Sequence, residues 1–136
     1  MKRSPCVLIV DADILVRHPL AEYLRECGYR VVQASNADEA RTLLTRRRGR
    51  PVIDVVLADV NGAGEENAFA LATWIRANHR GVQVILAGTV DAAAEKAGDL
   101  CEEGPTLSKP YDHQLLLDHI RRLLAARHRA DREGSA

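Results

Sequence analysis

Three apolar segments of the sequence each end in a charged residue that could bind an ion. The charged residues are Asp11, Asp59 and Lys109, which follow residues 7–10, 55–58 and 106–108. In an open parallel sheet, ligands bind in the crevice beyond the carboxyl ends of the strands. If the three segments are strands of one such sheet, two carboxylates and one ammonium group converge there. Such a set can hold a divalent cation together with an anionic group.

The segments that must position these residues alternate between strand and helix patterns along the whole chain. Short apolar runs, typical of parallel strands buried on both faces, lie at 6–10, 30–34, 53–58, 82–87 and 106–108. Apolar residues at helical spacing follow each run, at 15–27, from 36 to the arginine run 46–50, 68–78, 91–102 and from 112 to about 124. Repeated β–α units with short connections predict a doubly wound α/β fold with a five-stranded parallel sheet.

The charge and hydropathy patterns argue against two classes of partner. Nineteen basic and nineteen acidic residues leave no net charge, so the chain as a whole has no field that attracts nucleic acid or an anionic membrane. The apolar runs are about the length of strands and are too short to span a bilayer. We therefore expect neither nucleic acid nor a membrane as a partner. We also expect the chain to be a monomer or weak homodimer and to be located in the cytoplasm.

The 136 residues are enough for one domain with a real core, which we place at 1–126. The last predicted helix should bury the residues that share one of its faces, which are Leu115, Leu116, His119, Ile120 and Leu123. Beyond it, the polar residues 127–136 predict a disordered tail.

The three cysteines predict no cross-link. Cys6, Cys27 and Cys101 lie far apart and show no metal-binding spacing. An odd and sparse set fits reduced thiols in a cytoplasm better than a disulfide framework. Each is expected to be a small buried hydrophobic residue.

Taken in order, these motifs resemble the receiver domain of two-component response regulators, from residue 6 to about residue 124. The matching pieces are residues 7–11, 56–61 and 109–111, together with 23–29 and the closing helix. The chain is most similar to receivers of the single-domain type. The resemblance implies a flavodoxin-like fold with strand order 2-1-3-4-5.

The resemblance also implies a role for each strand-end residue. Asp59 corresponds to the carboxylate that accepts a phosphoryl group from a histidine kinase or a phosphotransfer protein. Asp11, Asp59 and the backbone carbonyl of Asn61 would hold Mg²⁺, and Lys109 would pair with the phosphoryl group as a compact point charge. A receiver of this kind is a signalling module, not an enzyme. Its downstream protein target would bind the face made by the fourth helix, fifth strand and fifth helix.

Several positions depart from the family pattern. The second acid expected after the first strand is Ala12, and Asp13 could replace it as a metal ligand only if its loop turns inward. The hydroxyl expected after the fourth strand falls at Gly88, and Thr89 could serve only with a shift of one residue. The aromatic switch position of the fifth strand falls at Thr106. Metal binding and signal relay are therefore both expected to be altered.

Two other functions stay open at this point. The first is a receiver-like module that binds a protein partner without being phosphorylated, which Ala12, Gly88 and Thr106 favour. The second is a phosphotransferase similar to the haloacid dehalogenases, with Asp11 as nucleophile and Asp13 as general acid. Those enzymes typically continue with Gly-Thr, whereas residues 14 and 15 here are Ile and Leu.

Overall fold

Among the residues that the structure describes, four parallel strands form the sheet that positions the strand-end residues. The computed structural model describes residues 4–45, 49, 52–61, 68–105 and 112–134. The strands are β1 (Cys6–Val10), β2 (Arg30–Ala34), β3 (Val55–Asp59) and β4 (Gln83–Ala87), in the order β2-β1-β3-β4. This order agrees with the prediction for the first four strands. The predicted fifth strand, at 106–108, lies outside the described residues.

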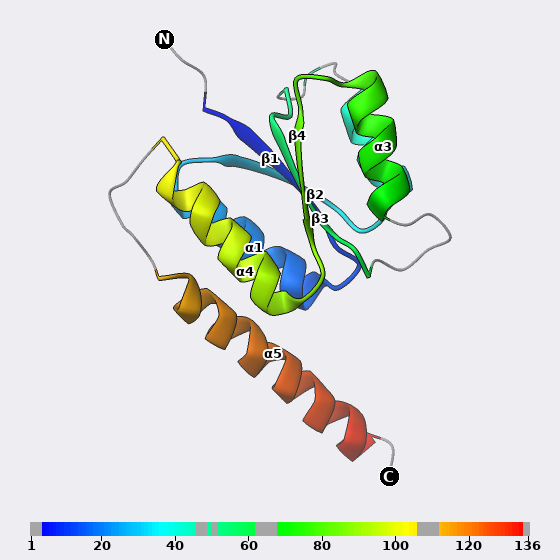
Figure 1. Cartoon of the computed structure of the whole chain (residues 1–136). Helices are drawn as coiled ribbons and strands as arrows, with labels where there is room; N and C mark the ends of the chain where they lie inside the picture. The colour runs from blue at the N-terminus through cyan, green and yellow to red at the C-terminus, as the bar shows by residue number, and fades with distance from the viewer. Residues whose placement is uncertain (1–3, 46–48, 50–51, 62–67, 106–111, 135–136) are drawn as a thin grey trace.

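In the part of the chain that the structure describes, five helices surround the sheet in layers. They are α1 (Ile14–Glu26), α2 (Ala37–Thr45), α3 (Ala68–Asn78), α4 (Val90–Glu102) and α5 (His113–Gly134). One core lies between the sheet and α1 with α4, and a second lies between the sheet and α2 with α3. The helix α5 packs against α4 and α1 as an outer layer, at the end of the molecule toward which the strands run (Figure 1).

The strand β1 contributes side chains to the cores on both faces of the sheet. All five of its residues are buried, and successive side chains of a strand point to opposite faces. Val7 and Ile9 join the core under α1 and α4, whereas Cys6, Leu8 and Val10 join the core under α2 and α3. A continuous apolar run is what such a central strand requires.

The helix α5 is longer than the sequence prediction. Residues 127–134, predicted to be a disordered tail, continue α5 to Gly134. The helix continues because Leu124 packs against the core and Arg127 binds Asp13 beyond it. The buried face also differs from the prediction: Leu115 is 61% exposed, and Leu117 is buried. This shift follows from the packing of α5 on two helices.

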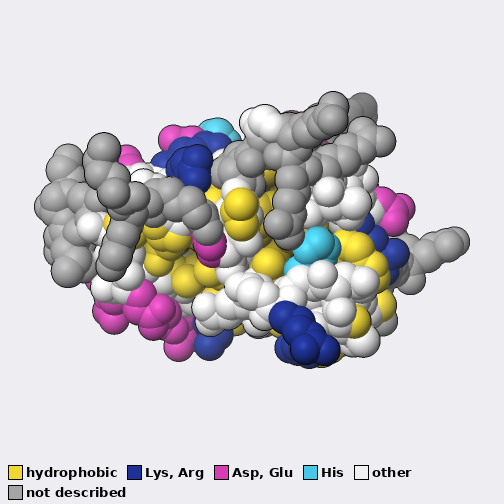
Figure 2. Space-filling model, turned by 90° about the horizontal axis from the view of Figure 1, so that it is seen from above, with side chains coloured by type: hydrophobic (Ala, Val, Ile, Leu, Met, Phe, Trp, Pro, Cys, Tyr) yellow, Lys and Arg dark blue, Asp and Glu magenta, His cyan; other side chains and the backbone are white. Residues whose placement is uncertain are grey.

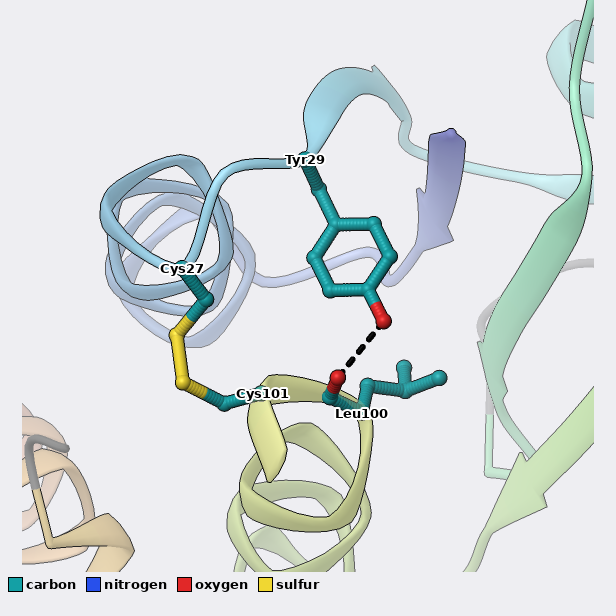
Figure 3. Close-up of a disulfide and its surroundings, with 4 residues drawn as sticks. All are labelled: Cys27, Tyr29, Leu100 and Cys101. Carbon is teal, nitrogen blue, oxygen red and sulfur yellow. Dashed lines mark hydrogen bonds between the residues drawn. A yellow bond between two sulfur atoms is a disulfide. The ribbon is translucent and has the colours of Figure 1, made fainter. Parts of the chain in front are cut away.

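The expectation of reduced cysteines is wrong for two of the three. Cys27, the C-cap of α1, and Cys101, in the last turn of α4, form a disulfide across a sequence separation of 74 residues (Figure 3). Beside it, the hydroxyl of Tyr29 donates to the backbone carbonyl of Leu100 at 2.5 Å. The two cysteines meet because α1 and α4 lie side by side on one face of the sheet. Cys6 is not part of this disulfide and is buried in β1, as expected.

The surface of the molecule carries no single dominant charge in the view from above. Figure 2 shows acidic and basic side chains in separate small groups, with hydrophobic and uncharged atoms between them. This distribution agrees with the balanced composition of the chain. Among the residues described, no helix has the length and apolar character needed to cross a membrane.

Candidate functional site

A cavity lies where the strands β1, β3 and β4 end. Its volume is about 570 Å³. Its polar lining comes from the three strand ends, from the starts of α1 and α4 and from α5, and consists of Asp11, Asp13, Asp59, Asn61, Thr89, Arg127, His128 and Asp131. Four of the sequence-predicted site residues that are carboxylates or amides thus share one cavity, together with Thr89.

Asp11 is the most deeply placed of the carboxylates. Only 8% of its surface is exposed, and its Oδ1 accepts a hydrogen bond from the backbone N–H of Asp13 at 2.8 Å. Burial raises the pKa of Asp11 to about 6, and the nearby carboxylates of Asp59 and Asp13 also raise it, whereas the N–H of Asp13 opposes them. A buried carboxylate beside other carboxylates is a place where a cation would be stabilised.

Asp59 reaches the same cavity from the neighbouring strand. In the register of β1 with β3, Val10 is paired with Ala58, so Asp11 and Asp59 follow adjacent residues. Oδ1 of Asp59 accepts from the backbone N–H of Asn61 at 3.1 Å, which folds the chain into a turn after β3. The side chain of Asn61 donates to the carbonyl of Gly88 and so joins this turn to the end of β4.

Asp13 has two partners that occupy its carboxylate oxygens. It is the N-cap of α1, where its Oδ1 accepts from the backbone N–H of Leu15 at 3.0 Å. Its two carboxylate oxygens also accept from both terminal nitrogens of Arg127, at 2.9 and 2.8 Å. The hydrogen bonds from Arg127 are the main reason that the pKa of Asp13 lies below its usual value.

The end of β4 shows what the two candidate switch positions do. Thr89 is the N-cap of α4, and its hydroxyl oxygen accepts from the backbone N–H of Ala92 at 3.0 Å. Gly88 precedes it and also lines the cavity. A Cβ atom at Gly88 would meet only Cγ2 of Val60, at an ordinary contact distance of 3.4 Å. The fold therefore leaves room for a side chain at this position.

The remaining predicted site residues cannot be placed in the cavity. Lys109, like Thr106 and the rest of the segment 106–111, lies outside the described residues. The helices α4 and α5, which belong to the predicted docking face, pack against each other. The strand predicted between them falls in the same segment as Lys109.

The described carboxylates fit a magnesium ion as a two-carboxylate site. Magnesium is usually held by one or two carboxylates, with water and phosphate oxygens completing its octahedral shell. Asp11 and Asp59 can supply the two carboxylates. In the part of the chain that the structure describes, no three His, Cys, Asp or Glu side chains are placed to hold a metal together. Asp13, which was predicted as a substitute ligand, is bound to Arg127 instead.

Arg127 is one of three polar cavity residues that the sequence prediction missed, together with His128 and Asp131. It was assigned to a tail, although a helical pattern leads up to it. Leu117, Ile120, Leu124 and Arg127 are spaced by three, four and three residues, so they lie on one face of a continuous helix. Following that spacing beyond Leu124 would have extended the helix. It could not have identified Asp13 as the partner of Arg127, 114 residues earlier in the chain.

A parallel sheet with helices on both faces and two carboxylates at the ends of β1 and β3 defines a flavodoxin-like α/β protein with an acidic ligand site. Comparison with known proteins identifies the family within this fold class. The model of the response regulator receiver domain matches residues 7–121, and the chain belongs to this family.

Individual relatives agree with this assignment. The chain is 30% identical over 126 residues to the transcriptional regulatory protein AruR of Pseudomonas aeruginosa, an alignment that spans 91% of this chain and 51% of AruR. The chain thus spans about half the length of this curated relative. It is also similar to a response regulator receiver protein from Pseudomonas putida, with a TM-score of 0.57, 27% identity and coverage of 90% of this chain and 99% of the other. A response regulator from Thermotoga maritima gives a TM-score of 0.55 at 26% identity, with the same two coverages.

Proposed function

We propose that the chain accepts a phosphoryl group on Asp59 from a histidine kinase or a phosphotransfer protein and signals through contacts with another protein. The observation that carries this proposal is the convergence of Asp11 and Asp59 in one cavity, from adjacent paired strands. Membership of the receiver family supports the same reaction class. A cytoplasmic location, where phosphodonor proteins of this kind act, is part of the proposal.

In this reaction, the carboxylate of Asp59 attacks the phosphorus of a phosphohistidine, the P–N bond breaks, and an aspartyl phosphate forms. Magnesium, when bound, reduces the repulsion between the incoming phosphoryl group and the carboxylate. Asp11 and Asp59 would hold the ion, with the backbone carbonyl of Asn61 as a third protein ligand. Lys109 would contact the phosphoryl oxygens from its segment beyond α4. Thr89 stands one residue beyond the expected hydroxyl position, and its oxygen already caps α4.

The structure favours this function over the phosphotransferase alternative. A general acid must be protonated in order to donate, and Arg127 holds the pKa of Asp13 below the usual carboxyl value. Asp13 is therefore a poor proton donor near neutral pH. A receiver needs no general acid at the position of Asp13, because its nucleophile is the carboxylate of Asp59 at the end of β3.

A receiver that works without phosphorylation is the second candidate. It is favoured by Ala12, which stands where the family pattern has an acid directly after Asp11, and by the engagement of Asp13 with Arg127. In this case the chain would bind its partner equally well with and without a phosphoryl group. Comparing partner binding with and without beryllofluoride, a mimic of the phosphoryl group, would separate the two candidates.

Phosphorylation by a small donor tests the first candidate directly. Incubation with acetyl phosphate and Mg²⁺ should add one phosphoryl group, detected as an increase in the intact mass. The variant Asp59→Asn should lose this increase. The matched control Asp99→Asn makes the same chemical change at an exposed position on α4 and should keep it. The absence of any mass increase at every Mg²⁺ concentration would contradict the proposal.

A further inference from the structure

The C-terminal part of α5 forms one wall of the cavity that holds Asp11 and Asp59. Four residues of one helix face make this wall: Leu124, Arg127, His128 and Asp131. Their spacing of three, four and seven residues is that of neighbours on one side of an α-helix. All four lie beyond residue 121, where the match to the receiver family model ends. The wall is therefore an addition to the part of the fold that the family model covers.

An ion pair ties this wall to the start of α1. Both terminal nitrogens of Arg127 donate to the two carboxylate oxygens of Asp13, at 2.9 and 2.8 Å. Two parallel N–H···O bonds fix the orientation of a guanidinium group more strongly than a single contact does. Asp13 is itself fixed as the N-cap of α1. The pair thus fastens the C-terminal part of α5 to Asp13, which lies two residues after Asp11 in the sequence.

This ion pair acts against a cation in the cavity in two ways. The guanidinium group of Arg127 neutralises the carboxylate of Asp13, which would otherwise add to the attraction exerted by Asp11 and Asp59. The pair also keeps α5 closed over the strand ends, where a phosphodonor protein must approach Asp59. The Arg127 side chain is 47% exposed and that of Asp13 is 30% exposed. A pair this accessible to water is weak enough to open.

We propose that residues 124–134 are a lid that opposes Mg²⁺ binding at the acidic cavity, with the Arg127–Asp13 pair as its latch. The inference rests on the function proposed above, because Mg²⁺ is the cofactor which that function requires. The lid and the ion exclude each other, so Mg²⁺ binding favours the open lid. By thermodynamic linkage, the closed lid weakens Mg²⁺ binding by the same factor by which Mg²⁺ opens the lid.

Two variants of Arg127 separate a latch from a simple charge effect. Arg127→Gln removes both the charge and the two-point contact. Arg127→Lys keeps the charge, but an ammonium group cannot reproduce the paired hydrogen bonds of guanidinium. The matched control is Arg129→Gln, which removes the same charge from an exposed position on α5 that does not line the cavity.

Mg²⁺ affinity should be measured from the amide chemical shifts of residues 10–13 during a titration with MgCl₂. We expect Arg127→Gln and Arg127→Lys each to bind Mg²⁺ about two- to fivefold more tightly than the unchanged protein, the size of effect that a partly exposed ion pair produces. Arg129→Gln should leave the affinity unchanged. Hydrogen exchange of residues 124–134 is the second readout, and Mg²⁺ should accelerate it in the unchanged protein.

The outcomes are distinct. An affinity that stays the same in Arg127→Gln would overturn the lid. A rise in Arg127→Gln without one in Arg127→Lys would also overturn it, because the effect would then be one of charge alone. Hydrogen exchange that does not respond to Mg²⁺ would remove the linkage on which the inference depends. Phosphorylation of Asp59 with any of these results would leave the proposed function standing. Lid opening by Mg²⁺ without phosphorylation would instead support the lid and contradict the proposed function.

Discussion

Loss of the disulfide between Cys27 and Cys101 should destabilise the fold by an amount that its loop length sets. The bond closes a loop across a sequence separation of 74 residues. In the chain-entropy model, a cross-link over such a loop removes enough freedom from the unfolded chain to stabilise the native state by roughly 4 kcal/mol. The question bears on the proposed function, because in the proposed cytoplasmic location most thiols are kept reduced, and α4 and α1 would then lose their covalent tie.

Urea unfolding in the presence and absence of dithiothreitol measures this contribution. The chain has one tryptophan, Trp74 on α3. It packs against His79 and against Arg41 of α2, so its fluorescence reports on tertiary structure away from the disulfide. With a slope of about 2 kcal/mol per molar urea, reduction should lower the midpoint by roughly 2 M. The double variant Cys27→Ala/Cys101→Ala is the control, and its midpoint should not respond to dithiothreitol.

Two results would refute this reasoning. A difference of less than about 1 kcal/mol between the oxidised and reduced protein would mean that the cross-link does not act through the unfolded chain as the loop-length model requires. Titration of the unreduced, denatured protein with a thiol reagent should find one reactive thiol, that of Cys6, which is not part of the disulfide. Three free thiols would show that the disulfide is absent.

Two further predictions concern the cavity. The folded pKa of Asp11 is raised from 3.8 to about 6, chiefly by burial, so stability falls as the pH rises from about 4 to about 6 and then levels off. Asp11→Asn removes this loss and should raise the free energy of unfolding at pH 7 by roughly 1–2 kcal/mol, allowing for solvent screening, with little effect at pH 4; equal stability at pH 7 in urea titrations would contradict it. Gly88→Ser places its Cβ 3.4 Å from Cγ2 of Val60 and should change stability by less than about 1 kcal/mol. The serine hydroxyl should increase the phosphorylation-dependent chemical-shift change across α4. An unchanged response would show that the lack of a hydroxyl at position 88 does not limit signal relay.

The sequence was sufficient to predict the elements that depend on local patterns. The continuous apolar runs predicted the four described strands. The order β2-β1-β3-β4 then followed from the family resemblance and is confirmed. Asp11 and Asp59 could be assigned to one site because residues that end adjacent parallel strands must meet at the same edge of the sheet.

What the sequence did not predict depends on contacts between distant residues. Nothing local to Cys27 indicates that the end of α4 will lie beside it, because that proximity arises only when α1 and α4 share one face of the sheet. Likewise, Asp13 was predicted as a possible metal ligand because Ala12 stands in place of the expected second acid. Its partner Arg127 was missed, because the polar composition of residues 127–136 suggested a tail and not a helix. A polar helix segment that lines a cavity has the same composition as a disordered tail, so the sequence alone does not distinguish the two.

The central claim is that Asp59 is the residue that becomes phosphorylated. The measurement that tests it most directly is to treat the protein with acetyl phosphate and Mg²⁺, reduce the acyl phosphate with borohydride, and locate the resulting homoserine by peptide mass spectrometry. Our account predicts homoserine at position 59 and unmodified aspartate at positions 11 and 13. Homoserine at position 11 would contradict the account and point to the phosphotransferase chemistry, and no homoserine at any position would point to a receiver that works without phosphorylation.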